Sequence, residues 1–180
     1  MSAVGTETHV YNLDPTHTSV EFIAKHMVIS KVRGRFAGIS GTIALAGTDV
    51  PVAIDVEIDA TSIDTREAQR DGHLKSPDFL DTDNHPKISF KSTSIEGAGP
   101  SFTIAGDLSI HGVTKPVTLS ATVDGHMTDP WGLDRIAYSA EGTIDRREFG
   151  LVWSQSLETG GLLVGNDIKL EFTVQAVRKP

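Results

Sequence analysis

The chain has 180 residues, with 16 basic and 24 acidic side chains, a formal net charge of −8 at pH 7 and no cysteine. This length suits one domain with a substantial core, and the missing cysteine excludes disulfides, zinc–thiolate sites and thiol catalysis. The scattered Lys and Arg residues and the acidic balance argue against nucleic acids and anionic membrane surfaces as partners.

The N-terminal segment bears on the compartment. Residues 1–24 contain no Lys or Arg and no apolar run, so the charged and hydrophobic parts of a secretory signal are missing. We therefore expect a cytoplasmic protein, unless a leader was removed. No segment approaches the ~20 apolar residues of a membrane-spanning helix, so we expect no stable membrane insertion. We predict one domain over residues 9–177, a disordered tail over 1–8 and a short tail over 178–180.

Alternation of apolar and polar residues predicts β-strands along most of the chain. The pattern is clearest in residues 52–60, 101–110, 117–123 and 168–174. In the first of these segments, apolar residues at Val52, Ile54, Val56 and Ile58 alternate with acidic ones. Such alternation is typical of antiparallel strands with one face on the core and the other in water.

Weaker strand patterns occupy residues 10–13, 19–26, 32–45, 88–95 and 135–144. The long segment 32–45 contains Gly34, Gly38 and Gly41, which predict a bend or a bulge. A chain rich in strands, with short connections and no crossover helices, folds as a barrel or a sandwich.

One segment departs from the strand pattern. Residues 64–67 resemble a capping box and predict a helix over 67–74, and Ser76-Pro77 predicts a second cap with a short turn through Leu80. This helical insert, over residues 65–80, lies between two strands and is placed to cover one end of a barrel.

Signatures of common enzymes are missing from the sequence, including the nucleophile elbow, the zinc-protease helix, the phosphate loop and the dinucleotide fingerprint. No two histidines have a spacing typical of chelation, although ligands distant in sequence can converge in a fold. We therefore predict no catalytic residue and no metal site. The histidines are His9, His17, His26, His73, His85, His111 and His126.

Five segments are more specific. They read DPTHTSVEF at 14–22, SIDT at 62–65 running into RDGHL at 70–74, HPKISF at 85–90, GDLSIHGVTK at 106–115 and DRREFGL at 145–151. In order and spacing, over about residues 11–174, these segments resemble the YceI-like family. Ser109 stands where that family often has threonine.

The resemblance implies a fold and a ligand. The implied fold is all-β: a single closed antiparallel barrel of about eight strands, lipocalin-like, with a short helical insert. The implied function is non-catalytic binding, storage or transport of a polyisoprenoid or another amphiphilic lipid, such as an isoprenoid quinone, with no other cofactor. Many members carry a secretion signal, and this chain resembles the branch that lacks one. We keep a homodimer open as its oligomeric state.

Ten apolar or aromatic side chains are expected to line a lipid tunnel in such a barrel. Small residues beside aromatic rings can leave space along the axis, although an eight-stranded barrel can also be filled by its own side chains. The expected lining residues are Phe22, Phe36, Ile54, Val56, Phe90, Phe102, Ile104, Leu119, Tyr138 and Phe172.

Five polar residues form a predicted cluster that either contacts a lipid headgroup or has a structural role: Arg70, Asp71, His73, His111 and Arg146. We expect an Arg70–Asp71 pair and His73 to tie the insert to the barrel, because buried polar groups are usually hydrogen-bonded. Arg146 is expected to pair with Asp145 or another acidic neighbour, or to meet the headgroup. Two alternatives stay open: a lipid-modifying enzyme with a His/Asp pair, and a filled β-domain that serves as an interaction module. Trp153, near Gly160-Gly161, is a candidate for a mobile flap.

Overall fold

The computed structural model describes residues 6–158, 160–161 and 163–180. Its strands are β1 (Thr8–Leu13), β2 (Ser19–His26), β3 (Ser30–Phe36), β4 (Ile39–Ala46), β5 (Pro51–Asp59), β6 (Ile63–Asp64), β7 (Lys87–Glu96), β8 (Ser101–Ile110), β9 (Val113–Thr128), β10 (Asp134–Asp145) and β11 (Val164–Arg178). The helix α1 spans Ala68–Lys75, and the short 3-10 turns η1 and η2 span Ala60–Ser62 and Arg146–Phe149.

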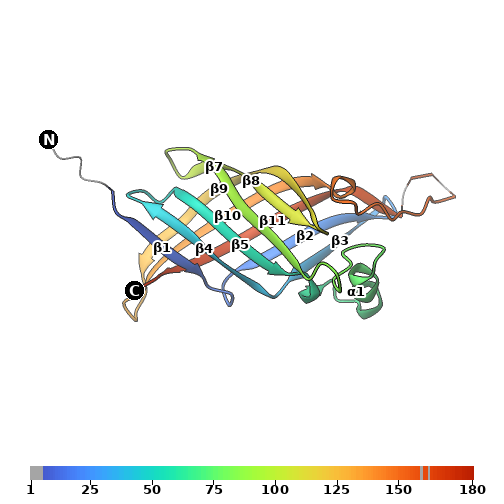
Figure 1. Cartoon of the computed structure of the whole chain (residues 1–180), viewed down its shortest axis with the longest axis horizontal. Helices are drawn as coiled ribbons and strands as arrows, with labels where there is room; N and C mark the ends of the chain where they lie inside the picture. The colour runs from blue at the N-terminus through green and yellow to red at the C-terminus, as the bar shows by residue number, and fades with distance from the viewer. Residues whose placement is uncertain (1–5, 159, 162) are drawn as a thin grey trace.

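Eight of these strands form a closed ring in the order β1-β4-β5-β7-β8-β9-β10-β11, with β11 paired back to β1. Every pairing is antiparallel, and the register Tyr11↔Arg178 closes the ring. The predicted closed antiparallel barrel of eight strands with one short helix is confirmed (Figure 1).

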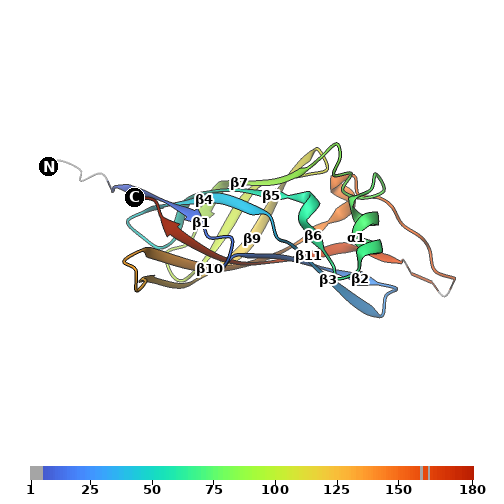
Figure 2. The ribbon, with the colours of Figure 1, turned by 90° about the horizontal axis from the view of Figure 1, so that it is seen from below.

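The long strand β11 gives the barrel its elongated shape. Its C-terminal part pairs with β1, whereas its N-terminal part pairs with β2 in the register Lys169↔Ile23. β2 and β3 therefore continue the wall beyond the ring. This extension and α1 lie at the end of the barrel opposite the C-terminus (Figures 1 and 2).

The predicted strand 32–45 bends at residues 37–38, which separate β3 from β4. Gly38 donates its N–H to Ser62 Oγ at 3.0 Å, and a Cβ at this position would lie 2.8 Å from Asp59 Cβ. Glycine is therefore required for the close approach of the bend to η1, as the sequence pattern indicates.

The helix begins where the sequence predicts, but its cap is different. Glu67 is the N-cap: its carboxylate accepts hydrogen bonds from the N–H groups of Gln69 at 3.1 Å and Arg70 at 2.6 Å. The predicted capping box that starts at Asp64 is wrong, because Arg66 adopts φ of 64° and turns the chain between Asp64 and the helix. The predicted turn through Leu80 is present.

Two strand details differ from the sequence pattern. Val52 is predicted to point inward, and this is wrong. Val52 is 54% exposed, and its neighbour Pro51 is buried instead. A bulge between β4 and β5 shifts the register there, and a shift of one residue reverses the face of a side chain. β1 begins at Thr8 and β11 ends at Arg178, one residue outside the expected domain limits at each end. The N-terminal tail is predicted to be disordered over residues 1–8, and residues 1–5 of it lie outside the part of the chain that the structure describes.

The core consists of the inward side chains of the barrel strands, joined at one end by Phe79 and Leu80 from the turn after α1 and by Phe149 and Leu151 at η2. Within the described part of the chain, no helix has the length and apolar character needed to cross a membrane.

Candidate functional site

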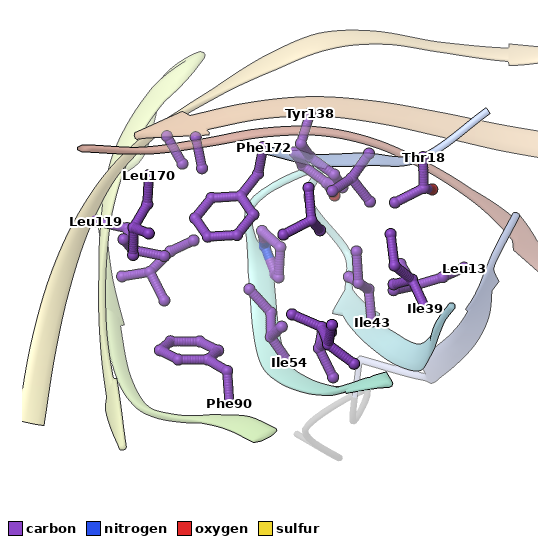
Figure 3. Close-up of a pocket in the computed structure, with 18 of the residues that line it drawn as sticks. Leu13, Thr18, Ile39, Ile43, Ile54, Phe90, Leu119, Tyr138, Leu170 and Phe172 are labelled. Carbon is purple, nitrogen blue, oxygen red and sulfur yellow. The ribbon is translucent and has the colours of Figure 1, made fainter. Parts of the chain in front are cut away.

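Two adjoining apolar cavities follow the axis of the barrel. The central cavity has a volume of about 100 Å³ and is surrounded by inward side chains of the ring strands (Figure 3). Its wall includes eight of the ten predicted lining residues: Ile54, Val56, Phe90, Phe102, Ile104, Leu119, Tyr138 and Phe172.

The second cavity, which we call the lid cavity, has a volume of about 140 Å³ and is bounded by the insert at the α1 end. Phe22 and Phe36, the remaining predicted lining residues, lie on its wall together with Leu74 and Phe79 of the insert. Phe172 and Leu170 border both cavities. The two spaces are therefore neighbours along one path, separated by apolar side chains.

An open hollow of about 610 Å³, here called the mouth, lies beyond the lid cavity. It is formed by β2 and β3, by α1 and the turn after it, and by the segment after η2. It shares Ala24, Leu74, Phe79 and Val164 with the lid cavity. Charged and polar side chains border the mouth, whereas the exposed walls of the two inner cavities are apolar. The polar residues on the mouth are Lys25, His26, Glu67, Gln69, Arg70 and His73.

The start of the insert is held at Thr65, which is 4% exposed. Asp71 Oδ1 accepts hydrogen bonds from the Thr65 N–H at 2.9 Å and from Thr65 Oγ1 at 2.5 Å. Arg70 donates from Nε to Thr65 Oγ1 and from Nη2 to the Thr65 carbonyl, both at 2.8 Å. The expected Arg70–Asp71 pair is wrong, since both side chains bond to Thr65 and no ion pair joins them among the described residues.

His73 lies in an aromatic group at the mouth. Its Nε2 is 2.9 Å from Asp78 Oδ2, and its ring meets Phe79 and Trp153 edge-on at centroid distances of 5.1 and 4.8 Å. Trp153 also contacts Phe79, with centroids 5.3 Å apart. Trp153, from the segment after η2, therefore forms part of the wall of the mouth.

Arg146 is 3% exposed and is bonded to backbone carbonyls. It donates from Nη1 to Leu151 O and Trp153 O, both at 2.7 Å, and from Nε to Gly165 O at 2.9 Å. The expected pair with Asp145 is wrong: Asp145 binds Arg147 at 2.6 Å, and burial lowers the pKa of Arg146. Arg146 thus holds the segment after η2 against β11 and borders the lid cavity.

His111 lies in the turn between β8 and β9, where its Nδ1 is 3.2 Å from the Phe149 carbonyl oxygen. Its ring contacts His85 with a centroid distance of 5.0 Å. The five polar residues of the predicted cluster divide among several places, with Arg70 and His73 both on the mouth. Arg70 and Asp71 meet at Thr65, His73 lies at the mouth, Arg146 binds loop carbonyls and His111 contacts His85, because each side chain is fixed by partners of its own.

Comparison with known proteins agrees with this geometry. Residues 11–176 match the YceI-like domain. The chain belongs to the YceI-like family. It is 42% identical over 137 residues to protein YceI of Shigella flexneri, which covers 75% of this chain and 71% of that protein.

Solved YceI-like structures share the barrel. The Campylobacter jejuni YCEI protein is 30% identical, with a TM-score of 0.77 over 87% of this chain and 90% of that one. A domain from Saccharophagus degradans, described as polyisoprenoid binding, has a TM-score of 0.72 at 16% identity, over 94% of this chain and 98% of that one. The latter likeness is one of fold.

This YceI-like barrel also has a polar group at the end away from α1, which the sequence pattern did not reveal. His126 lies between Asp49 and Asp134, with each ring nitrogen 2.6 Å from one carboxylate oxygen. Tyr11 donates its hydroxyl to Asp134 at 2.7 Å, and Tyr138 donates to the Asp49 carbonyl at 2.6 Å. Burial opposes a charge on His126, but the hydrogen bonds to Asp49 and Asp134 outweigh it and raise the pKa of the imidazole.

Proposed function

We propose that this YceI-like protein binds a long apolar lipid, a polyisoprenoid or an isoprenoid quinone, inside the barrel and carries or stores it without changing it chemically. The observation that supports the proposal most is the path of two apolar cavities that leads to a mouth bordered by polar side chains. The description of the Saccharophagus degradans domain as polyisoprenoid binding adds support.

The distribution of polar groups gives the orientation of the ligand. An isoprenoid tail in the inner cavities would gain about 25 cal/mol for each Å² removed from water. A polar headgroup there would lose its hydration without a partner, which typically costs more than ~1 kcal/mol. The headgroup therefore belongs at the mouth, near Lys25, Arg70 and His73, rather than at Arg146, whose donors are used by carbonyl groups.

The size of the cavities adds a requirement. Volumes of about 100 and 140 Å³ are small beside the ~300–1,000 Å³ of typical ligand sites. A long chain must therefore push side chains apart and join the two cavities. Five side chains border both spaces: Val20, Ile58, Leu108, Leu170 and Phe172. Leu170 and Phe172 are only partly buried, so we expect these two to move.

Thermal melts of delipidated protein test this function. A long polyisoprenol that binds only the native state, present at a hundred times its dissociation constant, should raise Tm by about 6–10 °C. A short prenyl alcohol should raise it less, because it leaves part of the path empty. Mass spectrometry of an organic extract should find the lipid chemically unchanged after prolonged incubation with the protein.

Leu119→Trp provides the blocking variant, because Leu119 is buried on the wall of the central cavity. We expect it to fold and to lose most of the shift caused by the long lipid. Val52→Trp is the matched control, since Val52 points outward from a barrel strand. A filled barrel would give a different result: no shift with any lipid and severe unfolding of Leu119→Trp. Conversion of the lipid by wild type but not by His73→Gln would establish an enzyme instead.

A further inference from the structure

Three side chains from separate parts of the fold converge beside the insert. Asp81 lies in the turn after α1, His85 precedes β7 and His111 forms the turn between β8 and β9. One potential ligand atom of each lies within 4.8 Å of the other two, and all three residues are half-buried. None of them takes part in the lipid path described above.

The hydrogen bonds around these residues leave their ligand atoms available. His111 Nδ1 faces the Phe149 carbonyl, so Nδ1 carries the proton and Nε2 is left with a lone pair. Among the described residues, the ring nitrogens of His85 have no hydrogen-bond partner. The Asp81 carboxylate accepts from Asn84 Nδ2 at 2.9 and 3.2 Å. A backbone carbonyl behind the histidine and an amide behind the carboxylate are the outer contacts that orient metal ligands in proteins.

The backbone is shaped around this convergence. Asp81 and His111 adopt the left-handed region, with φ of 47° and 56°. Gly112 allows the two histidines to approach, because a Cβ there would lie 2.7 Å from His85 Cε1. A left-handed backbone is strained for residues other than glycine and occurs preferentially at functional sites.

We propose that Asp81, His85 and His111 bind a divalent transition metal ion, with Zn²⁺ as the preferred ion. Two imidazoles and one carboxylate match the ligand types of zinc, and a water molecule would complete a tetrahedral site. Zn–N bonds of about 2.0–2.1 Å require donor atoms about 3.4 Å apart, so small side-chain rotations close the site around the ion. The proposal is independent of the lipid function.

The ion would connect the insert to the barrel. Leu80 and Ile110 directly precede Asp81 and His111 in the chain, and both lie on the wall of the lid cavity. A metal ion bound by Asp81 and His111 would therefore hold Leu80 and Ile110 in place on that wall. We therefore expect metal binding to stabilise the closed α1 end of the barrel.

Calorimetric titration of tag-free, delipidated, EDTA-treated protein with ZnCl₂ tests the proposal. We expect one Zn²⁺ per chain, a rise in Tm of about 6–10 °C at a hundredfold excess over the dissociation constant, and tetrahedral absorption bands when CoCl₂ replaces zinc. Asp81→Asn, His85→Asn and His111→Asn should each weaken zinc binding by more than about tenfold. Asparagine tolerates the left-handed backbone at positions 81 and 111, so these variants should fold.

His17→Asn is the matched control, because His17 also lies beside a carboxylate, 2.9 Å from Asp14, but outside the proposed site. It should bind zinc like the wild type. Asn84→Ala removes no ligand, only the amide that orients Asp81, and should weaken zinc binding by about tenfold. It provides a second test if a ligand variant has a lowered Tm even without metal. Absence of saturable zinc binding in the wild type, or equal affinity in the wild type and the three ligand variants, would overturn the proposal.

Discussion

At the scale of single residues, Arg146 is a buried side chain that bonds to several backbone carbonyls at once. Its guanidinium satisfies carbonyls of Leu151, Trp153 and Gly165 in a buried position. We expect Arg146→Met to lower the free energy of unfolding by about 3–5 kcal/mol, because several buried carbonyls lose their donor together. Urea denaturation measures the change. Arg147→Met, which removes an exposed pair with Asp145, is the control and should cost less than about 1 kcal/mol.

Lipid binding by Arg146→Met, measured beside its stability, distinguishes a structural role of Arg146 from contact with the headgroup. If the role is structural, the variant protein is less stable, whereas its lipid affinity per folded molecule stays near that of the wild type. Normal stability together with lost lipid binding would show instead that the headgroup reaches Arg146, as one of the interpretations of the sequence has it.

At the scale of elements, α1 depends on its attachment at Thr65. Asp71→Ala leaves the buried Thr65 N–H and hydroxyl without their acceptor, so we expect a loss of about 2–3 kcal/mol in unfolding free energy. Arg70→Ala should act in the same direction, because it removes two donors to Thr65. Hydrogen exchange over residues 65–80 should rise more than elsewhere. Gln69→Ala, an exposed neighbour on the same helix, is the control, and equal exchange in all three variants would contradict the anchoring role.

At the scale of the whole molecule, His126 joins the β4–β5 connection to β9 and β10 at the end away from α1. The pKa of His126 is raised in the folded protein, so its contribution to stability is fully present below its unfolded value near 6.5 and disappears as pH rises through the higher folded value. We expect the stability difference between wild type and His126→Gln to be larger at pH 6 than at pH 9. Urea midpoints across this range measure it, and a difference that grows with pH would contradict the ion pairs.

Low pH should destabilise the same end of the barrel, because it protonates Asp134. Burial opposes its charge, but hydrogen bonds from Tyr11 and His126 lower the pKa of its carboxyl below 3.8 in the folded state. This contribution is present above the unfolded value and is lost as pH falls through the folded one. The pair of His126 and Asp134 therefore stabilises the barrel most at pH values between these two ranges, where both side chains are charged.

The residue pattern alone predicts the strands and the faces of most side chains; it leaves a barrel or a sandwich open, and the closed barrel is what the resemblance to the YceI-like family implied. Alternation in 101–110 and 168–174 specifies β8 and β11 because each inward residue must be apolar and each outward residue polar, a constraint that acts locally. All ten residues predicted to line the interior do lie on the walls of the two cavities, for the same reason. Val52 is an exception, since a bulge depends on the partner strand.

Contacts between polar groups depend on the folded arrangement of the strands and turns. His126 and Asp49 are distant in sequence, as are His85 and His111, and nothing in their spacing signals the contact. Asp81 and His85 are four residues apart, but the third residue of the group comes from another turn of the barrel. Arg146, adjacent to Asp145, bonds to distant carbonyls instead, because closure of the barrel buries it among backbone groups that need its donors. The hydrogen-bond partner of a polar side chain depends on which groups the fold brings near it, whereas the face on which an apolar side chain lies follows from the two-residue period of the strand.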